Sequence, residues 1–116
     1  MPQDIPPILA LVRDLMFSSR ITAEARAADA KIKVLRDPGL LQSCDPSSTL
    51  ILVDLNLPGA IQAASTWQSQ NPSRTTIGFV SHEDAATISQ ARSAGIQQVL
   101  PRSRFVQILP QLLSKK

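Results

Sequence analysis

The chain has 116 residues, of which 43% are hydrophobic and 18% charged, and its formal net charge is +3. This length and composition predict one soluble globular domain over residues 1–116, and no apolar run is long enough for a membrane span. Cys44 is the one cysteine, which excludes an internal disulfide and is typical of a reducing, cytoplasmic protein.

The first part of the chain predicts a strand, a helix and a second strand. Residues 1–7 hold three prolines and are expected to be an extended lead-in. The apolar run Ile8–Val12 predicts a buried strand, and the helical spacing of apolar residues predicts a helix from Leu15 to about Ala30. In Lys31–Leu35 apolar residues alternate with lysines, which favours a strand nearer a sheet edge. Residues 39–44 can form at most a short helix.

The segment Leu50–Pro58 joins a buried strand to a carboxylate. Leu50–Val53 is an apolar run without a polar break, which is typical of a strand covered on both faces. Asp54 follows where we expect the chain to leave the sheet, and Asn56 with a Pro-Gly pair behind it predicts a turn. A carboxylate in this place lies where open α/β sheets bind their ligands. The alternative is that Asp54 only caps the next helix.

The second half predicts two further strand–helix units after a helix over Ala60–Gln70. The strand Thr75–Val80 leads to a helix that begins with Ser81 as its hydroxyl cap and acidic residues in its first turn. A last strand over Ile96–Leu100 is followed by a turn and by a helix that Pro110 should kink or shorten; its expected bounds are Phe105–Leu113.

Five strand–helix alternations predict a doubly wound parallel sheet with helices on both faces. Pro101 would break a central ladder, so the fifth strand should lie at an edge, in agreement with the flavodoxin-like strand order 2-1-3-4-5. In that order the carboxyl ends of the first, third and fourth strands lie side by side, and Arg102 joins them from the end of the fifth strand. The side chains brought together in this way are Arg13, Asp14, Asp54, Ser81 and Arg102.

This constellation resembles the receiver domain of bacterial two-component response regulators, of the chemotaxis-regulator type. The resemblance extends from Ile8 to Leu113, and its most specific motif is LVDLNLPG, around Asp54. It implies that Asp54 is the acceptor of a phosphoryl group from a histidine kinase. It also implies a Mg²⁺ site to which two acids after the first strand contribute. A hydroxyl after the fourth strand and a lysine after the fifth would contact the phosphoryl group.

The chain keeps part of that pattern. Asp14 matches the second acid, Asn56 matches the residue whose backbone carbonyl reaches the metal, and Ser81 matches the hydroxyl. Arg13 replaces the first acid and Arg102 replaces the lysine. A unit charge pair about 4 Å apart contributes roughly 4 kcal/mol at an effective dielectric constant of 20, so an arginine in place of an acid strongly disfavours a dication. We therefore expect no bound metal, with Asp14, Asp54 and Asn56 as residual ligand positions, and we expect Arg13 to bridge Asp54 and Asp14 unless it points into solvent.

Three functions remain open at this stage. The leading hypothesis is a signal-transduction module that acts through protein–protein interaction, with phosphorylation at Asp54 weakened or lost. The alternative is a phosphorylation-competent single-domain response regulator, which would use Mg²⁺. The third is a binder of a small ligand or nucleic acid on the same scaffold. Independent catalysis is not expected, because the first strand is not followed by a glycine-rich phosphate loop and His82 has no second histidine beside which to bind a metal.

The expected partner is another signalling protein, either a histidine kinase or a downstream effector. A homodimer is a further option, and membrane association is not expected. Residues 59–116 carry six Lys or Arg against two Asp or Glu, but no aromatic residues interleave with them, which disfavours nucleic acid. Receivers commonly signal through the face of their fourth helix, fifth strand and fifth helix. On this chain that face carries a set of basic residues: Arg92, Arg104, Lys115 and Lys116.

Overall fold

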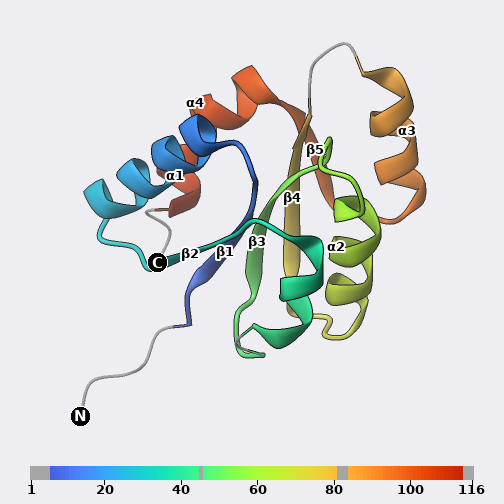
Figure 1. Cartoon of the computed structure of the whole chain (residues 1–116), viewed down its shortest axis with the longest axis horizontal. Helices are drawn as coiled ribbons and strands as arrows, with labels where there is room; N and C mark the ends of the chain where they lie inside the picture. Colours follow the sequence, from blue (N-terminus) through green and yellow to red (C-terminus); the bar gives the residue numbers. More distant parts are fainter. Residues whose placement is uncertain (1–5, 45, 81–83, 114–116) are drawn as a thin grey trace.

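The computed structural model describes residues 6–44, 46–80 and 84–113 (Figure 1). Its five strands form one parallel sheet in the order β2-β1-β3-β4-β5, which confirms the predicted doubly wound, flavodoxin-like architecture. The strand bounds are β1 Ile8–Leu11, β2 Ile32–Leu35, β3 Leu50–Asp54, β4 Thr75–Val80 and β5 Gln98–Pro101.

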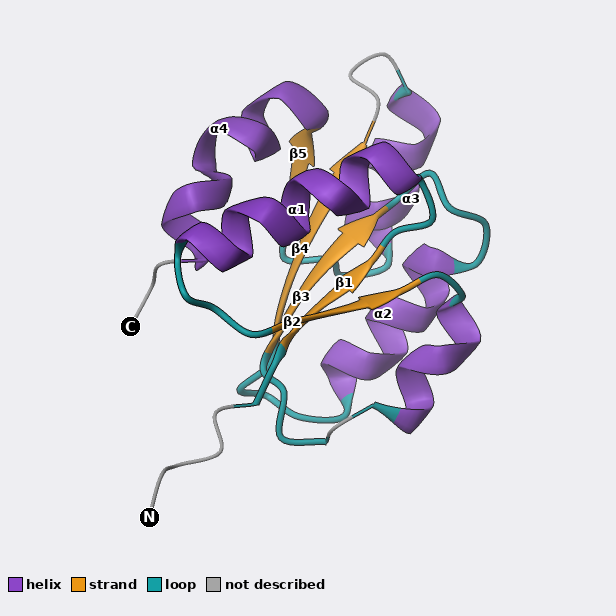
Figure 2. Ribbon diagram, turned by 60° about the vertical axis from the view of Figure 1, so that its left-hand side comes forward, coloured by secondary structure: helices purple, strands orange, loops and turns teal. Residues whose placement is uncertain are grey.

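Helices cover both faces of the sheet, as Figure 2 shows. The α-helices are α1 Leu15–Ala27, α2 Ala60–Ser69, α3 Ala85–Ser93 and α4 Arg102–Leu113, and a short 3₁₀ helix, η1, spans Pro38–Ser43. The core is divided accordingly. Ile21 of α1 and Leu109 of α4 pack on one face of the sheet, whereas Leu41 of η1, Trp67 of α2 and Ala91 of α3 pack on the other.

The carboxyl end of β3 is shaped by the turn that follows it. The strand includes Asp54, one residue beyond its predicted end, because the Leu55 amide still donates to the Phe79 carbonyl at 2.9 Å. Gly59 then begins α2 with a φ of +83°, a backbone conformation that glycine adopts without strain. Because Gly59 is the N-cap and no side chain caps α2, the alternative that Asp54 serves only as its cap is wrong.

Two predictions about the last elements need correction. Pro101 was expected in a turn, but it is the last residue of β5, where it is tolerated because β5 lies at the sheet edge and pairs only with β4. The helix α4 therefore begins at Arg102, three residues before its predicted start, and it continues through Pro110 to its predicted end at Leu113. Pro110 sits in the last turn, where its missing amide removes a single hydrogen bond.

The start of α3 also differs from expectation. Asp84 is its N-cap, and Asp84 Oδ1 accepts from the Thr87 amide at 3.1 Å. The predicted cap, Ser81, lies outside the described residues, as do residues 1–5 of the expected lead-in. Among the helices that are described, none has the length and apolar character required to cross a membrane.

Candidate functional site

Asp54 lies at the carboxyl end of the central strand β3 and is buried, with 7% of its surface exposed. One carboxylate oxygen, Oδ1, accepts the Asn56 amide at 3.0 Å and so fixes the first turn after the strand. The other, Oδ2, lies 3.5 Å from Nη2 of Arg102 at the start of α4. Both oxygens of this carboxylate therefore have a positively polarised neighbour.

Arg102 is held over a cluster of aromatic rings. Its guanidinium carbon lies 5.1 Å from the ring centre of Phe17 and 5.8 Å from that of Phe79, distances at which a cation is attracted by the ring face. Phe105 completes the cluster, with its ring centre 4.5 Å from that of Phe79 and 5.9 Å from that of Phe17. Arg102 Nε is buried without a hydrogen-bond partner among the described residues, so packing and one ion pair position this side chain.

Burial dominates the electrostatics of Asp54. Desolvation raises the pKa of its carboxyl above the usual 3.8, and the negative charge of Asp14 adds to this in a minor way. The Asn56 amide and the Arg102 guanidinium lower the pKa but do not cancel the effect of burial. Asp54 is thus a carboxyl whose ionised form is disfavoured by its surroundings despite the cation beside it.

The expected bridge from Arg13 to Asp54 and Asp14 is wrong. Arg13 is exposed, and its Nε donates to the carbonyl of Arg36 at 3.2 Å, while Arg36 Nη1 donates to the Arg13 carbonyl at the same distance. These reciprocal bonds tie the ends of β1 and β2 together and direct Arg13 away from Asp54. The cation that pairs with Asp54 is Arg102.

Asp14 has a structural role at this corner. It is the N-cap of α1, and its Oδ1 accepts the Met16 amide at 2.9 Å and the Phe17 amide at 3.5 Å. Capping of this kind stabilises a helix by about 1 kcal/mol. The carboxylate that the resemblance assigns to a metal is therefore engaged with helix amides, although it lies near enough to Asp54 to influence its pKa.

Asn56 connects the turn after β3 to the start of α3. Its Nδ2 donates to Asp84 Oδ2 at 2.7 Å, and the same oxygen accepts the Thr87 hydroxyl at 2.6 Å. The hydrogen bonds from the Thr87 side chain and backbone lower the pKa of Asp84 below 3.8. Asp84 was not singled out in the sequence as a residue near this site. Ser81, the predicted hydroxyl, lies outside the described residues.

The residues at this corner do not fit the Mg²⁺ ion that the resemblance implies. Mg²⁺ needs an octahedral set of oxygens. Here Asp54 is paired with Arg102, Asp14 accepts helix amides, and Arg13 stands where a further acid would be needed. In the described part of the chain, no three Asp, Glu, His or Cys side chains gather into a metal-binding group.

The predicted interaction residues lie around the β5 edge. Arg92 is in the last turn of α3 and Arg104 in the first turn of α4, and both are exposed. These two helices flank β5 from opposite faces of the sheet. Lys115 and Lys116 lie outside the described residues.

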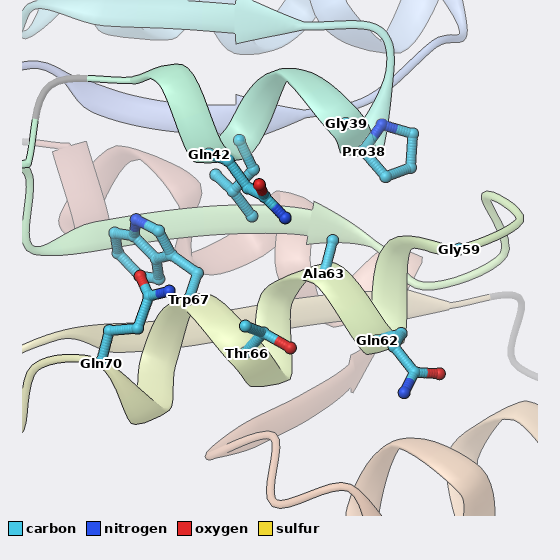
Figure 3. A pocket seen from close by; sticks show the side chains of 10 residues that line it. Pro38, Gly39, Gln42, Gly59, Gln62, Ala63, Thr66, Trp67 and Gln70 are labelled. Carbon is cyan, nitrogen blue, oxygen red and sulfur yellow. The ribbon is translucent and has the colours of Figure 1, made fainter.

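A groove of about 260 Å³ runs between η1 and α2. Figure 3 shows Pro38 and Gln42 on the η1 side facing Ala63 and Trp67 on α2. Among residues 6–44, 46–80 and 84–113, those that line this groove are uncharged and include none of the predicted site residues. It is therefore separate from the Asp54 corner and offers no anchor for an ionic ligand.

The aromatic support of Arg102 is the feature that the sequence interpretation missed. Arg102 and Phe105 are three residues apart on one helix, so their side chains lie on the same face. The chain contains three phenylalanines, and all three gather beneath this arginine: Phe17, Phe79 and Phe105. Two features of the sequence could have indicated this aromatic cluster: the small number of aromatic residues, and the three-residue spacing between Arg102 and Phe105.

No protein-family model matches the sequence, and no curated protein matches it. Solved structures are similar in fold. The beryllofluoride-activated NtrC4 receiver domain dimer has a TM-score of 0.73 and 13% identity, with 96% of this chain and 98% of that chain covered. A CheY-like response regulator receiver domain protein from Methanospirillum hungatei JF-1 has a TM-score of 0.73 and 11% identity, with 97% and 96% covered.

A third solved structure comes from a protein with a different description. A putative pilus assembly protein (cpaE) from Burkholderia thailandensis has a TM-score of 0.71 and 17% identity, with 96% of this chain and 97% of that chain covered. At these identities the similarity concerns the fold. The chain has the fold of response-regulator receiver (CheY-like) domains.

Proposed function

We propose that this chain is a receiver-like signalling module that acts by binding another protein, without catalysis of its own and with phosphorylation of Asp54 weakened or lost. The observation that carries the proposal is the ion pair between the buried Asp54 and Arg102, whose guanidinium rests on Phe17 and Phe79. The receiver fold of the chain supports the signalling role.

The chemistry of phosphoryl transfer explains why this corner is unfavourable for it. A carboxylate that attacks a phosphoryl group brings two anions together, so positive charge must be supplied to both. Arg102 already neutralises Asp54, and Arg13 is directed toward Arg36. The raised pKa of Asp54 also makes its nucleophilic, ionised form less favourable. An incoming phosphoryl donor would have to share Arg102, the one cation that pairs with Asp54 among the described residues.

The surface around β5 fits an output role. Arg92 and Arg104 are exposed on the two helices that flank this strand. Exposed charges of one sign steer a partner of opposite charge and act mainly on the association rate. We infer a partner with an acidic face, either a histidine kinase or a downstream effector. A second copy of the chain is a further candidate, since the NtrC4 receiver domain with this fold is described as a dimer.

Incubation with acetyl phosphate and Mg²⁺ followed by intact mass measurement tests the loss of phosphorylation. We expect wild-type protein to gain no phosphoryl group. For the same reason, beryllofluoride with Mg²⁺ should leave the amide NMR spectrum of the protein unchanged. The Arg13→Asp variant returns an acid to the first position and should bind Mg²⁺ measurably in calorimetry. A near-stoichiometric phosphoryl adduct on wild type that disappears in Asp54→Asn would refute the proposal.

That outcome would establish the alternative, a phosphorylation-competent response regulator. The placement of Asp54 favours it, because the carboxyl lies at the carboxyl end of the central strand β3 with Asp14 close enough to influence its pKa. The distinction therefore depends on the charge balance at this corner rather than on the fold.

A further inference from the structure

The outer edge of β2 is open. β2 pairs with β1 on one side, and within the described part of the chain no strand lies on its other side; Figure 2 shows it at the front of the sheet with α1 above it. The carbonyls of Lys31 and Leu35 accept amides from the β1 side at 2.9 Å. By the alternation of a parallel ladder, the amides and carbonyls of Ile32 and Val34 then point outward to the free edge.

Basic side chains flank this edge on both faces of the sheet. Ile32 and Val34 pack toward α1, so Lys31 and Lys33 point to the opposite face, and both lysines are exposed. Arg36, just beyond the strand, is also exposed. A strand added at this edge would therefore meet positive charge whichever way its side chains alternate.

A polar groove of about 380 Å³ runs along the α1 face of the same strand. Val34 and Arg36 line it from the β2 side, and Ser19, Thr22 and Arg26 line it from α1. None of the described residues that line the groove carries a carboxylate. The reciprocal bonds between Arg36 and Arg13 hold Arg36 in place, which reduces the entropy that it would lose on binding an anion.

We propose that the β2 edge and this groove form a docking site for an acidic, extended segment of a partner protein. The segment adds a strand beside β2 through the outward groups of Ile32 and Val34, and its carboxylates contact Arg26 and Arg36. Charge complementarity selects this occupant. A second copy of the chain in the same place would bring the lysines and arginines of two β2 edges together, so it is disfavoured.

Edge lysines also have a protective role, because they discourage unspecific strand pairing. Protection alone does not require a groove with two arginines beside the edge, and an acidic strand is the kind of strand that the charges of these lysines attract. The site lies at the opposite edge of the sheet from β5, and neither Asp54 nor Arg102 lines the groove; Arg13 contributes only through its bonds with Arg36. A failure of this inference would leave the proposed function untouched.

Fluorescence anisotropy with a labelled peptide of about ten residues that alternates Glu and Val tests the site. The control peptide has Pro at each Val position, which keeps the charge but removes the amides that a ladder needs. We expect saturable binding of the Glu–Val peptide alone, with shifts of the Ile32 and Val34 amides in NMR spectra. Arg26→Glu with Arg36→Glu should weaken it at least roughly tenfold.

Arg92→Glu with Arg104→Glu is the matched control, because it reverses the same number of charges at the other edge of the sheet. Because these two arginines belong to the proposed output surface, this control is measured through the Ile32 and Val34 amide shifts, which report on the β2 edge, and the affinity obtained from them should be nearly unchanged. If both double variants weakened peptide binding equally, the effect would come from net charge alone and not from a site at β2. If the proline peptide bound as tightly as the Glu–Val peptide, strand addition would be excluded. Displacement by inorganic phosphate at low millimolar concentration would assign the groove to small anions and overturn the proposal. If the Arg26/Arg36 variant does not fold, Lys31→Glu with Lys33→Glu provides the same test.

Discussion

Arg102 Nη2 lies 3.5 Å from Asp54 Oδ2, and this contact joins the first residue of α4 to the last residue of β3. It replaces the arrangement in which a metal ion would neutralise acids at this corner. The carboxylate is buried, whereas the arginine side chain is 38% exposed and lies over Phe17 and Phe79. The pair therefore spans the boundary between the aromatic cluster and solvent, and its energetics should depend on pH.

Asp54→Asn is expected to stabilise the protein at neutral pH. Because burial raises the pKa of Asp54 above 3.8, the folded state binds this proton more tightly than the unfolded chain does. Ionisation of Asp54 therefore destabilises the fold progressively as pH rises from about 3.8 through the raised pKa. Asn removes that effect and can still accept the Asn56 amide. Thermal unfolding across pH should show a higher Tm for the variant at pH above this window and no difference below it.

Asp84→Asn should show the opposite pH dependence. The hydrogen bonds from Thr87 lower the pKa of Asp84, so its ionised form stabilises the folded state at any pH above 3.8. That contribution is lost as pH falls through the lowered pKa. The variant should therefore have a lower Tm than wild type at neutral pH and approach it in acid. A parallel response of the Asp54 and Asp84 variants to pH would contradict both assignments.

The strand order was predictable because it depends on patterns that are local in sequence. Apolar runs such as Leu50–Val53 predict the buried strands, and the edge preference of Pro101 agrees with the flavodoxin-like order, without knowledge of any long-range contact. The direction of Arg13 was not predictable in this way. Both Asp54 and the Arg36 carbonyl can accept hydrogen bonds from a guanidinium. Which of them Arg13 contacts depends on the relative positions of two strand ends.

The continuous course of α4 past Pro110 was not predictable for a related reason. Pro110 alone predicts an interrupted helix, but in α4 its neighbours Leu109 and Leu113 are buried against the sheet, and this packing outweighs one lost hydrogen bond. The Arg102–phenylalanine cluster likewise joins α1, β4 and α4, which are far apart in the sequence. Spacing within one helix showed only the Arg102–Phe105 part of it.

Arg102→Ala should destabilise the fold by about 1–2 kcal/mol at neutral pH, less than the 3–5 kcal/mol of a fully buried pair, because Arg102 is partly exposed. The loss should diminish in acid, where Asp54 is protonated. Adding Asp54→Asn should recover part of it, since no buried charge is then left without a partner. Arg13→Ala is the matched control and should change stability by less than about 0.5 kcal/mol. Chemical denaturation of wild type and these three variants at neutral and acidic pH measures the differences in unfolding free energy.

Gly78→Ala should destabilise the protein through a steric conflict in the sheet. A Cβ at Gly78 would lie 2.6–2.8 Å from three side-chain atoms of Leu55, which is itself buried. The whole Leu55 side chain would have to move, at a cost of about 1–3 kcal/mol. Gly39→Ala provides the control, because its Cβ would have its nearest neighbour at 3.4 Å. Equal unfolding free energies for the two variants would show that Leu55 can move without penalty.

The β5 surface can be separated from the Asp54 chemistry by reversing charge at Arg92 and Arg104. Both side chains are exposed, so Arg92→Glu with Arg104→Glu should leave the fold intact and reduce the amount of partner protein that co-purifies with the tagged chain. The reduction should be larger at low salt, because screening weakens rim charges in the wild-type complex as well. Asp54→Ala should leave co-purification nearly unchanged, since the proposed output does not depend on phosphorylation. If Asp54→Ala abolishes the interaction while the arginine reversals do not, the chain signals through a phosphorylation switch.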